Sequence, residues 1–263
     1  MLSENLAWQI ESVEQKLQRA HHHLQDLKNR LPRGPQHYEI SRELQADGLT
    51  EIFTFHEKER PSPELSAIAG DFINNAWNAL NHIAMALHIA RSGVPTRREE
   101  ARIAYPLIVD TNGISQARAE FKAFVEKHCW GIHPEAITIM ETNQPYNTGN
   151  GAFRWLYELA RIDRHRKLNL PYHMASGVSS FSVPDGVWLD ALGGTSPIED
   201  GAVIARLRWN TRPDTNMYFH FLCEIAFSDG QRTEQVTTIA DWIFRRVGKL
   251  RDDLALFYAV EFT

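Results

Sequence analysis

Cysteine is scarce in this sequence, which contains only Cys129 and Cys223 in 263 residues. The two residues are far apart, and neither belongs to a CxxC pair. Disulfide frameworks are typical of short secreted chains that are dense in cysteine. We therefore expect two reduced thiols and no disulfide framework.

Long apolar runs are missing as well, because no segment reaches the roughly 20 residues that a membrane-spanning helix needs. The opening residues, MLSENLAWQIESVEQ, also lack the basic and apolar regions of a signal peptide. These two absences lead us to expect a cytoplasmic protein that makes no contact with a membrane.

Several catalytic signatures are absent too. The sequence has no glycine-rich phosphate loop, no GxSxG elbow, and neither an HExxH nor an ExxH motif. Nothing in it indicates a nucleotide hydrolase. An excess of positive charge is also missing, since the formal net charge is −5. This charge argues against broad wrapping around nucleic acid, whereas a local contact with RNA remains open.

Apolar residues, in contrast, are plentiful, and a hydrophobic content of 43% can bury a substantial core. The most apolar stretch runs from Leu65 to Ala90, where Asp71 is the only formally charged residue. No proline interrupts it, and its apolar residues recur at helical spacing. These residues are Ile73, Ala76, Leu80, Ile83 and Leu87. The pattern predicts a buried helix around which the chain is organised.

A narrow polar stripe runs along this helix, opposite its apolar face. At about 100° per residue, it contains Asp71, Asn75, Asn78 and His82. Apolar residues bound the stripe at both ends, so we interpret it as a polar seam inside a helical bundle. Each buried polar group without a partner costs about 1–3 kcal/mol. We therefore expect a second polar helix to face the stripe.

The remaining segments predict an α+β fold. Helices are expected over residues 6–31, 115–128, 134–142, 153–167 and 235–258. Strands are expected over residues 38–44 and 51–56, which form a β-hairpin around Asp47-Gly48, and over three to five short segments between 170 and 227.

These elements predict a helical bundle over residues 1–168, with the β-hairpin inserted at about 37–57. Residues 169–263 should add a small antiparallel β-sheet and a closing C-terminal helix that packs back, so that the chain makes one continuous domain. The segment QPYNTGNG is expected to be a loop. The aromatic residues of the later strands are expected in the sheet core, namely Trp188, Trp209, Phe219 and Phe221.

Two motifs carry a resemblance to a known family. They are GDFINNAWNALNH, from Gly70 to His82, and RIDRHR, from Arg161 to Arg166. Together they resemble a family of bacterial and phage proteins in which a helix reading GDxxHNLRSALDH precedes one reading NNIDKHR, with a β-rich tail after it. The RSALDH segment of that family is in turn similar to the R-x4-6-H signature of HEPN-type helical ribonucleases.

The resemblance implies RNA binding, or metal-independent RNA cleavage, in a defence or stress role. In HEPN enzymes the Arg stabilises charge at the scissile phosphate, and the His performs acid–base or positioning work. Here His82 matches the His, while Trp77 stands at the Arg position and Asn81 at the Asp position. Arg161 is the candidate for the missing cation, because it lies one helical turn before His165.

The resulting hypothesis is a catalytic site made of His82, His165 and Arg161. The residues expected to support it are Asp71, Asn75, Asn78, Asp163 and Arg166. A His can accept the 2′-hydroxyl proton of RNA while a cation offsets the phosphate charge. This chemistry needs no metal and no other cofactor.

Three alternatives arise from the same residues. The seam can be purely structural, with Asp163 and Arg166 as an internal ion pair, in a non-catalytic module whose C-terminal sheet binds a protein partner. Asp71, His82 and His165 can also be read as metal ligands from facing helices. Finally, a small basic cluster can contact phosphate or form a solvated face; it consists of Arg154, Arg164, Arg166 and Lys167. The oligomeric state does not follow from the sequence.

Overall fold

The structure of the chain, a computed structural model, divides into two compact units. The helical unit consists of Met1–Leu27, Ala67–Lys167 and Ile239–Thr263, and the sheet unit consists of Lys28–Ser66 and Leu168–Thr238. The structure describes residues 2–32, 36–148, 151–174, 186–191, 197–211, 223–229 and 232–259.

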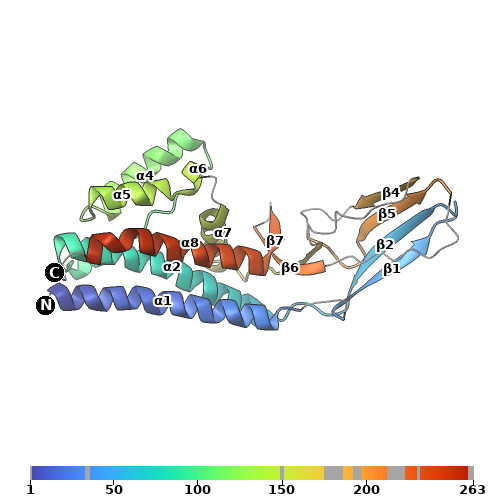
Figure 1. Ribbon diagram of the computed structural model, residues 1–263, viewed down its shortest axis with the longest axis horizontal. Helices are drawn as coiled ribbons and strands as arrows, with labels where there is room; N and C mark the ends of the chain where they lie inside the picture. The colour runs from blue at the N-terminus through green and yellow to red at the C-terminus, as the bar shows by residue number, and fades with distance from the viewer. Residues whose placement is uncertain are drawn as a thin grey trace. The chain divides into compact units, whose positions relative to one another are not determined.

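Long helices dominate the helical unit (Figure 1). The longest are α1 (Leu2–Arg30), α2 (Pro63–Ser92) and α8 (Val236–Ala259). The others are α3 (Arg97–Glu100), α4 (Ile114–His128), α5 (Pro134–Thr142), α6 (Pro145–Thr148) and α7 (Gly151–Asp163). Together with two small antiparallel sheets, these elements confirm the predicted α+β class and its closing C-terminal helix.

Helix α2 supplies the centre of the helical core. Its predicted apolar face is at most 2% exposed, at Ile73, Ala76, Leu80, Ile83 and Leu87. Burial of each Leu or Ile side chain contributes roughly 1.5–3 kcal/mol, so the four on this face together contribute roughly 6–12 kcal/mol. The helix ends at Gly93, whose φ of 85° suits glycine and whose N–H donates to the carbonyl of Ile89 at 3.0 Å.

Two local predictions along the chain were wrong. The expected loop QPYNTGNG contains the short helix α6, which begins at Pro145 because proline is well suited to the first turn of a helix. The helix expected to continue to Lys167 ends at Asp163. The chain leaves the helix there because Leu168 and Leu170 are buried side chains of the sheet unit.

The predicted β-hairpin is present in the sheet unit. Strands β1 (Tyr38–Leu44) and β2 (Thr50–Glu57) pair antiparallel, and Tyr38 lies opposite Glu57. The turn depends on Asp47, whose carboxylate accepts from the backbone N–H groups of Leu49 and Thr50 at 2.9 and 2.8 Å.

Later strands extend this hairpin into a four-stranded sheet of order β1-β2-β5-β4, in which β5 is Val203–Trp209 and β4 is Val187–Ala191. A second sheet has the order β3-β6-β7. Its strands are Tyr172–Met174, Cys223–Ser228 and Thr233–Gln235. An aromatic cluster of Tyr38, Phe55 and Tyr172 fills the core of the sheet unit, with ring centroids 5.4–6.1 Å apart.

The predicted aromatic core of the later strands is correct only in part. Trp209 is buried, as expected, whereas Trp188 is 53% exposed. Trp188 lies on β4, which is an edge strand of its sheet, so fewer neighbours cover its side chain. Phe219 and Phe221 lie outside the described residues.

Membrane-spanning segments were searched for in the same described ranges. No helix there combines the length and the apolar character that crossing a membrane requires.

Candidate functional site

The polar residues of α2 form two neighbouring stripes rather than one. The first is the predicted stripe of Asp71, Asn75, Asn78 and His82. The second lies one residue back along the sequence and contains Gly70, Asn74, Trp77 and Asn81. Because one residue rotates the side chain by about 100° around a helix, the two stripes contact different partners.

The first stripe faces α1. The Ser12 hydroxyl and His82 Nδ1 are hydrogen-bonded at 2.8 Å, and Gln9 donates through its side-chain amide to the His82 carbonyl at 3.3 Å. At the other end of the stripe, Asp71 is close enough to His23 to act on its pKa. The second polar helix that the stripe requires is therefore α1, which runs antiparallel to α2.

Burial disfavours the charged form of the imidazoles in this seam. Burial lowers the pKa of His82, and the nearby Lys16 ammonium lowers it further. Burial also lowers the pKa of His23, although the Asp71 carboxylate acts in the opposite direction. A neutral imidazole donates from one ring nitrogen and accepts at the other, which suits a hydrogen bond with the Ser12 hydroxyl.

The other residues of the first stripe make fewer contacts with α1. Asn75 donates from its side-chain amide to the carbonyl of Asp71 at 2.8 Å, one turn back in the same helix. Asn78 is half-buried between the two ends of the seam, and Asp71 is exposed at its edge. Within this stripe, the hydrogen bonds that join α1 to α2 are therefore made at His82, by Gln9 and Ser12.

The second stripe faces α7. Asn74 donates to the Asp163 carboxylate at 2.8 Å. At Gly70 an added Cβ would lie only 2.5 Å from Asp163 Oδ1, so the glycine makes room for this carboxylate. The GDFINN and RID segments of the two motifs therefore meet, through Gly70, Asn74 and Asp163.

Further along this stripe, Trp77 contacts two residues from α7 and the turn after it. The Arg164 guanidinium lies over the Trp77 ring, 5.4 Å from its centroid, and the Tyr157 ring is 6.4 Å away. Asn81 accepts from the backbone N–H of Tyr105 at 3.1 Å, which ties the segment after α3 to α2. The residue that replaces the Arg of the family motif thus packs against another Arg.

The remaining predicted residues lie at the exposed end of α7. Arg161 donates to the Glu158 carboxylate at 2.9 and 3.0 Å, and its side chain is 54% exposed. His165 and Arg166 are exposed in the turn that follows the helix. Asp163 accepts from Asn74, and no ion pair joins it to Arg166 among the described residues.

The structure therefore brings together some of the proposed site and not the rest. Asp163 reaches α2, but it does so at Asn74, eight residues before His82, which is about 12 Å along the helix axis. In the described part of the chain, no hydrogen bond or ion pair joins His82 to Arg161 or His165. The catalytic assignment of these three residues stays a prediction.

Sequence reasoning missed Ser12, Asn74 and the stacking role of Arg164. Ser12 had a readable signal, because polar residues follow helical spacing along α1 beside its apolar face; these are Gln9, Ser12, Lys16 and His23. Asn74 had none, because Asn74 and Asn75 are adjacent amides and only packing decides which of them meets α7.

The sequence also allowed a metal site with Asp71, His82 and His165 as ligands. Among the residues for which coordinates are described, no group of three His, Cys, Asp or Glu side chains gathers closely enough to hold a metal ion. Of the three proposed ligands, Asp71 and His82 face α1, whereas His165 lies in the turn after α7.

A functional assignment rests on the contacts that the two stripes of α2 make with α1 and α7, and on the two sequence motifs. Comparison of the chain with protein-family models, with curated proteins and with solved structures found no match.

Proposed function

We propose that this chain binds single-stranded RNA at the end of α7 and does not cleave it. The binding surface, here called the α7 basic surface, consists of Trp77, Tyr157, Arg164, His165, Arg166 and Lys167. The observation that carries the proposal is the Arg164 guanidinium held over the Trp77 ring at 5.4 Å, beside further exposed basic residues.

This combination of groups suits unpaired RNA. Bases stack on aromatic rings and on guanidinium planes, and each such stack contributes about 1–3 kcal/mol. Arg164, Arg166 and Lys167 supply the positive charge that neutralises phosphates. Trp77 and Tyr157 are only half-buried, so part of each side chain is in contact with solvent. The net charge of −5 restricts such binding to a local contact.

Binding without cleavage is supported by the contacts of the candidate catalytic groups. General acid–base catalysis requires groups within about 2.6–3.2 Å of the atoms that exchange protons. His82 is hydrogen-bonded to Ser12 on the α1 side of α2, and Arg161 is paired with Glu158. A ribonuclease with His82, His165 and Arg161 as its catalytic residues is the competing proposal.

Fluorescence anisotropy with a short labelled single-stranded RNA tests the proposal. Replacing Trp77 with Ala should weaken binding by about 5-fold to 100-fold, which corresponds to one lost stack. Arg164→Lys keeps the charge but loses the planar stack, so its affinity should fall while its salt dependence stays unchanged. Lys167→Ala should instead reduce the slope of log affinity against log salt by about 0.7.

A second surface pair provides the matched control. The Arg102 guanidinium lies 5.3 Å from the Trp130 ring, and Trp130 is 42% exposed. Trp130→Ala should therefore leave RNA affinity unchanged. Failure of the unmodified chain to bind RNA, or equal losses in the Trp77 and Trp130 variants, would refute the proposed surface.

The same RNA, analysed for integrity on a denaturing gel, distinguishes binding from cleavage. We expect intact RNA with the unmodified chain. Cleavage that disappears in His82→Ala and His165→Ala variants of normal thermal stability would instead establish the ribonuclease proposal.

A protein partner at the four-stranded sheet is the second candidate function. It is supported by Trp188, which is 53% exposed on the edge strand β4, because exposed aromatic residues are enriched at protein interfaces. Trp188→Ala distinguishes this candidate from the first. It should leave RNA binding unchanged and remove binding only to a partner that uses the sheet.

A further inference from the structure

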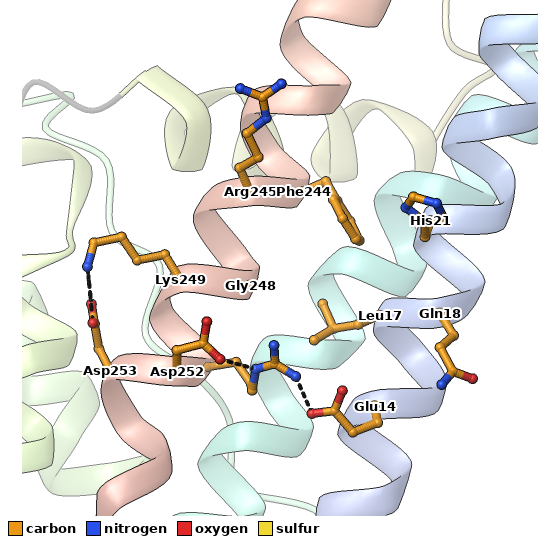
Figure 2. Close-up of a pocket in the computed structure, with 11 residues that line it drawn as sticks. Glu14, Leu17, Gln18, His21, Phe244, Arg245, Gly248, Lys249, Asp252 and Asp253 are labelled. Atoms are coloured by element: carbon orange, nitrogen blue, oxygen red, sulfur yellow. Dashed lines mark hydrogen bonds and ion pairs between the residues drawn. The ribbon is translucent and has the colours of Figure 1, made fainter.

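A groove lies between α1 and α8 on the helical unit (Figure 2). Its volume is about 660 Å³, and it is lined on the α1 side by Leu17 and His21, among others. Phe244 lies across from them on α8, and its ring centroid is 5.2 Å from that of His21. None of these residues belongs to the α7 basic surface, so the groove requires its own explanation.

Gly248 lies on the α8 side of the groove, in the middle of a helix of 24 residues. Glycine weakens a helix interior relative to alanine, because it adds backbone freedom to the unfolded chain. Gly248 does not have a positive φ, and nothing lies within 4 Å of the position that a Cβ would occupy. Neither its conformation nor its neighbours within the described chain require a glycine, whereas close approach of a second helix would.

The charges that line the groove are balanced. The acidic residues are Glu14, Asp252 and Asp253, and the basic residues are Arg245, Lys249 and Arg251. Within the helical unit, Arg251 pairs with Glu14 and Asp252, and Lys249 pairs with Asp253. Arg245 is exposed and has no ion-pair partner among the described residues. A surface with equal numbers of both charges can meet a copy of itself without net repulsion.

The order of these residues along α8 makes the surface complementary to its own copy. Arg245 and Asp252 are seven residues apart, so they lie on nearly the same face of the helix, and Figure 2 shows Gly248 between them. When two such helices cross antiparallel with the two-fold axis between Gly248 and Lys249, each Arg245 lies opposite Asp252 of the other copy. One two-fold axis thus creates two ion pairs.

We propose that the chain forms a two-fold homodimer through this groove, with the two α8 helices antiparallel and crossing between Gly248 and Lys249. The proposal does not depend on RNA binding.

Sedimentation analysis of the full chain between about 1 μM and about 100 μM tests the proposal, because a dimer gains population with concentration. R245E places two acidic groups opposite each other at both contacts, and D252R does the same with two basic groups. Each variant alone should dimerise at least about tenfold more weakly. An equimolar mixture of the two variants should restore a heterodimer, because every contact again joins opposite charges.

Two further variants separate the interface from folding. G248L places a bulky side chain in the groove at a position where an added Cβ meets no atom within 4 Å. It should therefore abolish the dimer, while the monomer keeps a melting temperature at least as high as that of the unmodified chain. R98E carries the same change of charge at an exposed residue of α3, away from the groove, and should dimerise normally. A chain that is monomeric at every concentration overturns the proposal. So does a dimer that survives G248L, or a pair of charge variants that mixing does not rescue.

Discussion

The contact between Gly70 and Asp163 predicts how much a Gly70→Ala substitution changes the free energy of unfolding. In Gly70→Ala, the new Cβ would lie 2.5 Å from Asp163 Oδ1 and 3.0 Å from its Cγ. Carbon and oxygen atoms do not approach so closely, so the Asp163 carboxylate must move. That movement breaks its 2.8 Å hydrogen bond with Asn74.

Opposing free-energy terms decide the size of the effect. Alanine in place of glycine stabilises a helix interior by about 1 kcal/mol. A lost hydrogen bond to a charged group costs roughly 1.5–3 kcal/mol, and overpacking adds roughly 1–3 kcal/mol. Asp163 is only half-buried and can turn toward water, so the lower values apply. Gly70→Ala should therefore destabilise the chain by about 1–2 kcal/mol, which lowers Tm by about 2–8 °C.

Thermal denaturation of a double-mutant cycle checks this calculation. In an Asp163→Ala background the carboxylate is gone, so Gly70→Ala should change sign and raise stability by up to about 1 kcal/mol. Gly248→Ala is the matched control at concentrations where the chain is monomeric, because nothing within the chain lies within 4 Å of its added Cβ and it should stabilise the monomer in either background. If Gly70→Ala has the same effect with and without Asp163, the two residues do not pack as described.

Two further predictions follow from buried titratable groups. Burial lowers the pKa of three histidines from 6.5, namely His23, His82 and His88. The unfolded chain then binds protons more readily than the folded chain, so stability is retained above about pH 6.5 and lost as the pH falls below it. Chemical denaturation between about pH 7.5 and pH 5 should show this loss, and it should be smaller in His82→Gln; a flat profile would contradict the burial of these rings. Burial also raises the pKa of Cys129 and Cys223 to about 12. Mass spectrometry should therefore find neither thiol alkylated by iodoacetamide in the folded chain at about pH 8 and both alkylated in denaturant, and rapid native labelling would refute their burial.

Local patterns predicted the elements of the fold well. The apolar spacing of Ile73 to Leu87 predicted α2 because a helix face repeats over a few residues, and those side chains are buried as expected. The Asp47-Gly48 turn was equally readable, since the bonds that Asp47 makes go to residues two and three positions later. The wrong predictions concern the segment that forms α6, the end of α7 and Trp188, and the last two depend on contacts distant in sequence.

The candidate site was less predictable because helical geometry leaves a choice open. Asn74 and Asn75 differ by one residue, yet one binds Asp163 and the other binds the backbone of its own helix. In the sequence, Trp77 stands where the family motif has an Arg. The structure shows that this same residue stacks with Arg164, and that contact led to the proposal of RNA binding.

The sequence by itself determined which segments are helices and strands, and it determined that α2 carries polar groups that need partners. Those properties depend on the order of neighbouring residues and on the cost of burying an unsatisfied polar group. Only the tertiary structure decided that α1 faces the His82 stripe and that α7 faces Asn74 and Trp77. The reason is that a step of one residue turns a helix by about 100°, so packing between distant segments determines which side chains meet.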